Sequence, residues 1–300
     1  MTHFSDDLTH ATRTLMTPLC VGLDPFPDLI PAFFGATGHL RTVEAFFNAV
    51  VDAVANIVPV VKPQIGLFEP WGSEGVALVG RLSERARTQG LMVILDAKRG
   101  DIGSTAEGYA RAYLGPEAQV ACDCMTINPY LGLDSLEPFA AMAQSQGKGI
   151  AVLVRTSNPG AQDFQDLMVD GAPLWTRVGE KLQSLEARLM GESGYSSLMV
   201  VCGATWPAEA QRLRAILTKS LFLVPGYGAQ GGAARDALAG LVSGPNGPEG
   251  GVVSSSRGIL YPEGARDATS LAAWRAIFEA NLAAVIDDLR VASEPVVPRG

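Results

Sequence analysis

Two carboxylates and one ammonium group lie close together in the stretch Asp96-Ala97-Lys98-Arg99-Gly100-Asp101. The stretch follows an apolar run over residues 91–95 that is typical of a buried strand. Because side chains alternate between the two faces of a strand, Asp96 and Lys98 are expected on the same side. Ionic groups crowded at a strand end are costly to desolvate, so the pattern favours a site whose chemistry rests on lysine and aspartate. A structural ion pair that closes the strand end is the alternative interpretation.

Histidine and metal chemistry find little support in the sequence. The three histidines, His3, His10 and His39, precede the second expected strand and fall outside every motif. A histidine general base and a Ser-His-Asp triad are therefore not expected. Cys122-Asp123-Cys124 has neither the spacing nor the second pair of a zinc site, and no cluster of acidic residues with histidine occurs. We expect no metal.

Strand-like runs and helical periods alternate along the whole chain, and these elements must position the charged cluster. The eight expected strands cover residues 19–24, 58–68, 91–95, 120–127, 149–155, 197–202, 221–224 and 251–254. The helices expected after them cover residues 43–57, 73–89, 104–113, 135–146, 175–190, 207–217, a short segment after Gly232, and 271–289. Eight such units in one chain of this size predict an α/β fold, a (β/α)8 TIM barrel. An open doubly wound sheet is disfavoured because no Gly-x-Gly-x-x-Gly follows the first strand.

The chain is expected to form a single domain over residues 1–300. Residues 1–15 and about 291–300 are expected to be peripheral or frayed, and residues 243–250 to be a loop insertion. No composition break in between marks a second domain.

Composition limits which partners and which cellular compartment are expected. The net charge is -8 and basic residues form no run, which argues against a nucleic-acid polymer as partner. The four cysteines lie in apolar strand-like runs, so we expect buried thiols in a reducing, cytoplasmic environment. No signal peptide is recognisable at the start, and no apolar run is long enough to span a membrane.

Polar side chains gather where the expected strands end, and in a barrel the carboxyl ends of the strands carry the catalytic groups. These residues are Asp24, Lys62, Asp96, Lys98, Asp101, the run Thr156-Ser157-Asn158, the glycine-rich run 225–232 and the run Ser254-Ser255-Ser256-Arg257-Gly258. Barrels often bind phosphate between the loops after strands seven and eight. Glycine backbone there can approach phosphate oxygens, and Arg257 and Gln230 can donate hydrogen bonds to them. Tight turns with a surface arginine are the alternative.

The ordered set of motifs resembles the orotidine 5'-phosphate decarboxylase family. Asp96-x-Lys98-x-x-Asp101-Ile102 resembles the signature of that family, and residues 96–105 resemble its longer-chain bacterial group (type 2). Further matches are Lys62-Pro63-Gln64, Asn128-Pro129-Tyr130-Leu131-Gly132, Thr156-Ser157-Asn158-Pro159-Gly160, residues 225–232 and Ser256-Arg257-Gly258. The matches follow in order from about residue 19 to 262.

This resemblance implies decarboxylation of orotidine 5'-phosphate to UMP in de novo pyrimidine biosynthesis, without cofactor or metal. The implied catalytic array is Lys62, Asp96, Lys98 and Asp101, with Lys98 as proton donor. Asp24 is implied to bind the ribose, Ser157 the pyrimidine, and Gln230, Arg257 and Gly258 the phosphate. Asp101 and Thr105 are similar to residues that reach into the neighbouring subunit, which implies a homodimer. The role of Asn128 stays open: ordering of the rim is one possibility.

Two other functions are compatible with parts of this pattern. Magnesium-dependent sugar-phosphate lyases share the Asp-x-Lys-x-x-Asp spacing, and loss of activity in a chelator would indicate one of them. A non-catalytic barrel that binds a phosphorylated ligand would need no lysine–aspartate array. Binding and turnover measurements together separate these alternatives.

Overall fold

Eight parallel strands close into a barrel in the computed structural model, which describes residues 3–228 and 231–294. Around the barrel the order is β1-β12-β9-β8-β5-β4-β3-β2. The strands are β1 (Leu19–Leu23), β2 (Val60–Pro63), β3 (Met92–Arg99), β4 (Cys124–Ile127), β5 (Gly149–Arg155), β8 (Ser196–Cys202), β9 (Ser220–Val224) and β12 (Gly251–Ser255). The predicted (β/α)8 barrel is confirmed.

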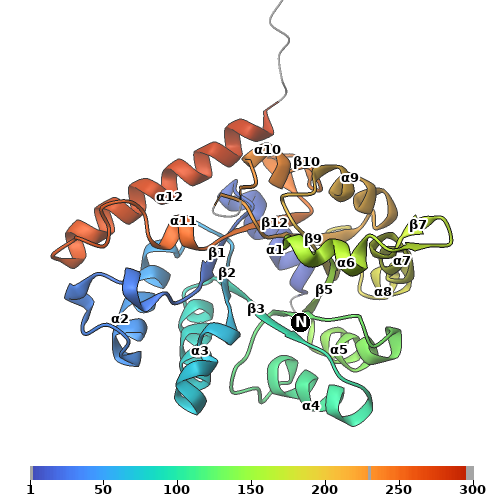
Figure 1. The fold of residues 1–300 in the computed structure, drawn as a ribbon, viewed down its shortest axis with the longest axis horizontal. Helices are drawn as coiled ribbons and strands as arrows, with labels where there is room; N and C mark the ends of the chain where they lie inside the picture. The colour runs from blue at the N-terminus through green and yellow to red at the C-terminus, as the bar shows by residue number, and fades with distance from the viewer. Residues whose placement is uncertain (1–2, 229–230, 295–300) are drawn as a thin grey trace, which may run out of the picture.

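Helices surround the strands (Figure 1). They are α2 (Leu40–Val54), α3 (Gly72–Thr88), α4 (Gly103–Leu114), α5 (Leu133–Gln146), α7 (Leu174–Lys181), α8 (Gln183–Arg188), α9 (Pro207–Ile216), α10 (Ala234–Ala237), α11 (Arg257–Leu260) and α12 (Leu271–Ser293). Of the helices within the described ranges, none combines the length and apolar character that crossing a bilayer requires.

The apolar core has two layers, because every barrel strand is covered on both faces. One layer lies between strands and helices and includes Phe46, Phe139 and Trp274. The other fills the barrel and includes Ile94 and Met199. The four cysteines are buried in these layers as free thiols, and burial raises the pKa of Cys20 to about 12.

The N-terminal segment differs from expectation. Phe4–Leu15 form the helix α1, whose Phe4 and Leu8 are buried against the residues that fill the barrel. The Phe4 amide donates to the Gly147 carbonyl, just before β5 begins. Residues 4–15 are therefore helical rather than frayed, because two apolar side chains one helical turn apart pack against the residues that fill the barrel.

Three further segments depart from the expected elements. The predicted helix over 175–190 is divided into α7 and α8, and the run after β5 contains a short helix, α6 (Gln162–Gln165). That run also contains a small hairpin, β6 (Met168–Val169) with β7 (Ala172–Pro173). The predicted loop insertion at 243–250 is a hairpin of β10 (Val242–Gly244) and β11 (Gly247–Glu249). At the other terminus α12 is helical through Ser293, and residues 295–300 lie outside the described ranges.

Candidate active site

A cavity of about 1080 Å³ lies at the carboxyl ends of the strands. It is lined by six of the predicted site residues, namely Asp24, Lys62, Asp96, Lys98, Ser157 and Arg257. Asp101, Thr105 and Gly258 do not line it, and Gln230 lies outside the described residues. The structure thus brings together residues from five strands, as the rule for barrel sites predicts.

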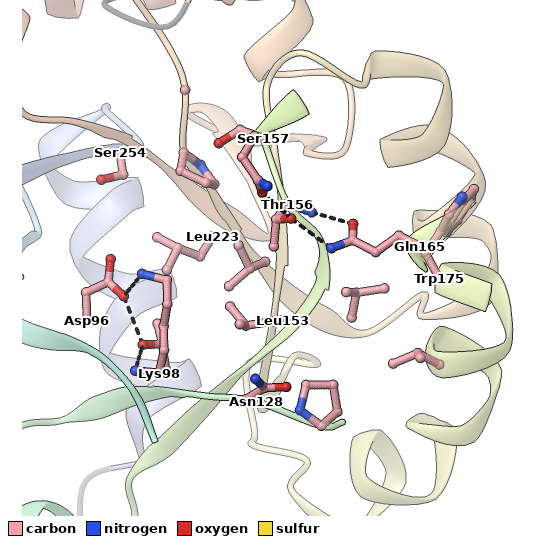
Figure 2. Close-up of a pocket in the computed structure, with 18 of the residues that line it drawn as sticks. Asp96, Lys98, Asn128, Leu153, Thr156, Ser157, Gln165, Trp175, Leu223 and Ser254 are labelled. Atoms are coloured by element: carbon pink, nitrogen blue, oxygen red, sulfur yellow. Dashed lines mark hydrogen bonds and ion pairs between the residues drawn. The ribbon is translucent and has the colours of Figure 1, made fainter. Parts of the chain in front are cut away.

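Asp96 is the centre of the polar contacts in this cavity (Figure 2). Its Oδ1 accepts hydrogen bonds from Lys98 Nζ at 2.5 Å and from Thr126 Oγ1 at 3.0 Å. Its Oδ2 accepts from Lys62 Nζ at 3.1 Å and from Gln64 Nε2 at 2.9 Å. Four donors from three strands and an adjoining turn therefore fix one carboxylate, and Lys62 and Lys98 lie on its two sides.

The electrostatics of this cluster favour the ionised state of its buried members. Burial alone would raise the pKa of Asp96, but the charges of Lys62 and Lys98 outweigh burial and hold that pKa well below its usual range. Burial likewise opposes the charge of Lys62, and the carboxylates of Asp96 and Asp24 more than compensate, so the pKa of Lys62 is raised. The side chain of Lys62 is 6% exposed, whereas that of Lys98 is 46% exposed toward the cavity. Of these two lysines, Lys98 is therefore the one whose ammonium group can contact a ligand.

The strand that carries Lys98 is irregular. The register between β3 and β4 shifts between Leu95 and Arg99, and Lys98 has a φ of 48°. A left-handed conformation is uncommon for a residue with a side chain and is often found at functional sites. Asp96 and Lys98 do share a side, as expected, but a bulge rather than regular strand alternation brings them together.

Asp24 directly follows β1 and lies beside this cluster. Its Oδ1 is buried and has no hydrogen-bond partner among the described residues. The backbone carbonyl of Asp24 accepts a hydrogen bond from the Tyr261 hydroxyl at 3.0 Å. The same hydroxyl accepts a hydrogen bond from the Phe26 amide at 3.0 Å. The backbone around Asp24 is therefore held in place while one carboxylate oxygen is left for a ligand hydroxyl.

Arg257 begins the short helix α11, directly after β12. Its guanidinium lies over the ring of Phe26, with 4.7 Å between the central carbon and the ring centroid. Within residues 3–228 and 231–294, Arg257 forms no ion pair with a carboxylate. An exposed, oriented guanidinium without an acidic partner is a suitable site for an anionic group such as phosphate.

The loop after β5 is held by contacts that sequence reasoning missed. The Thr156 amide donates to Gln165 Oε1 at 3.0 Å, and Gln165 Nε2 donates back to Thr156 Oγ1 at 2.8 Å (Figure 2). Trp206 Nε1 donates to the Thr156 carbonyl at 2.9 Å. Ser157 follows directly and packs over Gly203, where an added Cβ would lie 2.8 Å from the Ser157 Cβ. The loop is fixed on three sides, and no spacing signal in the sequence indicated Gln165 or Trp206.

Asp101 and Thr105 lie apart from the cavity, at the start of α4. Asp101 Oδ1 accepts a hydrogen bond from the following backbone amide, that of Ile102, at 2.8 Å. Thr105 is exposed on the first turn of the helix. Within one chain, neither residue forms a hydrogen bond or an ion pair with Lys62, Asp96 or Lys98. Over the same described ranges, no three His, Cys, Asp or Glu side chains are grouped as a metal site.

The fold and the cavity define a barrel enzyme that combines a Lys–Asp–Lys cluster with a free arginine at the carboxyl ends of its strands. The family model described as Orotidine 5'-phosphate decarboxylase / HUMPS family matches residues 17–269. The chain belongs to this family.

Relatives and solved structures agree with that membership. The chain is similar to orotidine 5'-phosphate decarboxylase of Rhodopirellula baltica, with 40% identity over 87% of this chain and 89% of the relative. It is 42% identical to orotidine 5'-phosphate decarboxylase of Clostridium tetani, over 81% of this chain and 83% of that one. The solved structure of Leishmania donovani OMP decarboxylase superimposes with a TM-score of 0.77 at 27% identity, covering 97% of this chain and 99% of that chain.

Proposed function

We propose that this protein decarboxylates orotidine 5'-phosphate to UMP and carbon dioxide, as a step of de novo pyrimidine biosynthesis in the cytoplasm. The observation that carries this proposal is the Asp96 carboxylate held between Lys62 and Lys98 in a cavity that also contains Arg257. This arrangement places a proton donor, Lys98, and a residue that can bind phosphate, Arg257, in one site. Family membership supports the same reaction.

Lys98 is the residue that we propose for the chemical step. The bond between C6 and the carboxylate breaks, its electron pair stays on C6, and carbon dioxide leaves. The ammonium of Lys98 stabilises the charge that develops on C6 and then transfers a proton to it, and water later restores the lysine proton. Asp96 keeps that ammonium at a fixed position, and Lys62 balances the second oxygen of Asp96.

The other residues bind the parts of the nucleotide that do not react. Asp24 has a free buried oxygen that can accept a hydrogen bond from a ribose hydroxyl. Ser157 is held on the fixed loop after β5 for the pyrimidine, and Arg257, Gly258 and Gln230 bind the phosphate. Binding energy from the phosphate can order the site before the chemical step.

We further propose a homodimer in which Asp101 and Thr105 complete the site of the neighbouring subunit. Two observations support this. Asp101 does not line the cavity of its own chain, and its carboxylate is oriented by a hydrogen bond from the Ile102 amide. Exposed apolar side chains lie on the same region of the rim, with Ile102 59% and Tyr130 81% exposed, and large exposed apolar groups mark interaction surfaces.

The reaction can be tested by following the absorbance change when orotidine 5'-phosphate is added to protein prepared without metal. Turnover that persists in a chelator supports the proposal. Activity that needs magnesium would point instead to a sugar-phosphate lyase. Binding of UMP without any turnover of orotidine 5'-phosphate would indicate a non-catalytic barrel.

Subunit mixing tests the shared site. Lys98→Ala and Asp101→Ala each inactivate the homodimer in this proposal, but a mixed dimer regains one intact site. Random mixing should therefore restore about a quarter of the wild-type activity, since half of the dimers are mixed and each has one working site of two. Mixing that restores nothing would show that Asp101 acts within its own chain.

A further inference from the structure

The irregular part of β3 leaves backbone groups without their usual partners. β3 pairs with β4 as Leu95 with Met125 and next as Arg99 with Ile127. Three residues of β3 therefore face the single residue Thr126 of β4. A ladder gives each amide one carbonyl acceptor, so the extra residues of a bulge lose theirs.

The side chain of Thr126 supplies the missing acceptor. Its Oγ1 accepts hydrogen bonds from the Ala97 amide at 2.9 Å and from the Lys98 amide at 2.8 Å. The same hydroxyl donates its proton to Asp96 Oδ1 at 3.0 Å. A hydroxyl has one proton to donate and two lone pairs to accept with, so all of its capacity is used. Thr126 itself is 1% exposed, so its hydroxyl is shielded from bulk solvent.

These three bonds join the backbone of Lys98 to the carboxylate that holds its ammonium. The left-handed conformation of Lys98 is unfavourable by itself. The hydrogen bond from the Lys98 amide to Thr126 Oγ1 offsets part of that cost. The β-branched side chain of threonine has few rotamers, so the oxygen is held where all three partners need it. Asp96 and Lys98 are consequently set relative to each other by one oxygen atom.

We propose that Thr126 is the positioning residue of this site: its hydroxyl holds the bulge of β3 in the shape that places the ammonium of Lys98 for proton transfer. Thr126 acts through Lys98 and Asp96 and is not itself a proton donor to the substrate. The catalytic part of this inference rests on the proposed decarboxylation, whereas its structural part does not.

The experiment compares Thr126→Val with Thr126→Ser. Valine keeps the shape but removes the oxygen, and serine keeps the oxygen. For Thr126→Val we expect kcat to fall by about 10- to 100-fold, because small misplacements of a reacting group have effects of this size. KM should change less than about threefold, since the Thr126 hydroxyl bonds Asp96, Ala97 and Lys98 rather than Asp24 or Arg257. Thr126→Ser should recover kcat to within about threefold of wild type.

Thr176→Val is the matched control. Thr176 is also buried, and its hydroxyl has no hydrogen-bond partner among the described residues, so the same substitution should leave kcat, KM and the melting temperature near those of wild type. Amide hydrogen exchange gives a readout that needs no substrate. The Ala97 and Lys98 amides should exchange faster in Thr126→Val than in Thr126→Ser or wild type.

The outcomes separate this inference from the proposed function. If wild type does not turn over orotidine 5'-phosphate, the proposed function fails, and the exchange rates still decide the role of the hydroxyl in the bulge. A folded Thr126→Val protein with wild-type kcat and exchange would overturn the inference, as would a Thr126→Ser protein as impaired as Thr126→Val. If Thr126→Val does not fold, Thr126→Cys replaces it, because sulfur accepts hydrogen bonds only weakly. Equal kcat and equal amide exchange rates in Thr126→Cys and Thr126→Ser would then overturn the inference.

Discussion

Both ends of the barrel contain carboxylates that are shielded from water, and the two ends satisfy them differently. At the carboxyl ends of the strands, Asp24 has a buried oxygen without a partner and Arg257 has no acidic partner among the described residues. At the amino ends, Glu249 is bonded twice by Arg13, at 2.7 and 3.0 Å, and once by the Tyr195 hydroxyl at 3.1 Å.

The pKa directions follow these contacts. The hydrogen bonds from Arg13 hold the pKa of Glu249 below its usual range despite burial, and burial together with Glu249 raises the pKa of Tyr195 to about 12. Groups at the amino end are thus bonded to one another and to α1. At the carboxyl end Asp96 is fully bonded, whereas Asp24 and Arg257 keep unused hydrogen-bonding capacity. An unpaired buried oxygen is unfavourable until a ligand binds, so Asp24, together with the unpaired Arg257 in the same cavity, supports the carboxyl end as the functional end without reference to any relative.

The largest effect is expected for Lys98→Ala. Removal of the proposed proton donor should lower kcat by about 1,000-fold or more. The melting temperature should fall only a little, because Asp96 loses one cation but keeps its bonds to Lys62, Gln64 and Thr126. Steady-state kinetics with orotidine 5'-phosphate and thermal unfolding measure the two quantities. A kcat within tenfold of wild type would remove Lys98 from the mechanism.

Arg257→Ala should have the next largest effect. Hydrogen bonds to charged groups contribute about 1.5–3 kcal/mol, so the KM for the nucleotide should rise about 10- to 100-fold. Arg275→Ala is the control, because Arg275 is exposed on α12 and, in the part of the chain that the structure describes, pairs only with Glu279, four residues along the same helix. An unchanged KM in Arg257→Ala would show that the phosphate binds elsewhere.

Glu249→Gln tests the amino end and should reverse the pattern. Loss of the charge should lower the free energy of unfolding by about 1–3 kcal/mol, whereas kcat and KM of the folded protein should stay within about twofold of wild type. Urea unfolding and kinetics of the same samples measure both. Glu279→Gln, on the exposed pair with Arg275, should change stability little. A large loss of kcat at full stability would mean that the two ends are coupled.

The smallest expected effect is a pH dependence at Asp123, which lies just before β4. Burial raises the pKa of Asp123 above its usual 3.8, although Arg87 lies 3.3 Å away. The folded state therefore binds this proton more tightly than the unfolded state. Stability from Asp123 increases as pH falls through the raised folded-state pKa toward 3.8, and it is smallest above that window.

Comparison of wild type with Asp123→Asn isolates this contribution, because the variant lacks the titrating group. The difference in unfolding free energy between the two should shift in favour of wild type as pH falls. Asp96 behaves in the opposite way: its stabilisation is present above pH 3.8 and is lost as pH falls below it. A wild-type advantage that grows with rising pH would contradict the assignment at Asp123.

The barrel and most of its charged site could be predicted from local patterns. Strands covered on both faces are continuous apolar runs, and a parallel barrel brings all their carboxyl ends to one rim, so Lys62 and Asp96 could be placed together without coordinates. The donors Gln64 and Thr126 were missed, although both lie on or beside strands of that rim. Period-two alternation cannot reveal a bulge, and the bulge is what makes Thr126 important.

The contacts that fix the loop after β5 were beyond prediction for a different reason. The sequence around Gln165 shows neither helical nor strand periodicity, although Gln165 ends the short helix α6. Trp206 donates a hydrogen bond to Thr156, which lies fifty residues earlier in the sequence. Polar pairings of this kind depend on the final geometry rather than on spacing. The helix α1 was missed because its burial depends on strands far along the chain.

This last dependence has a consequence for how the protein is made. Ser5, near the start of the chain, donates its hydroxyl to the Tyr195 carbonyl, and its amide binds the Ser197 hydroxyl, 192 positions away. The helix α1 is synthesised long before β8, so its contacts with Tyr195 and Ser197 form only after β8 has emerged. The helix α1 is therefore synthesised before β8 but completes its packing only after β8 has formed.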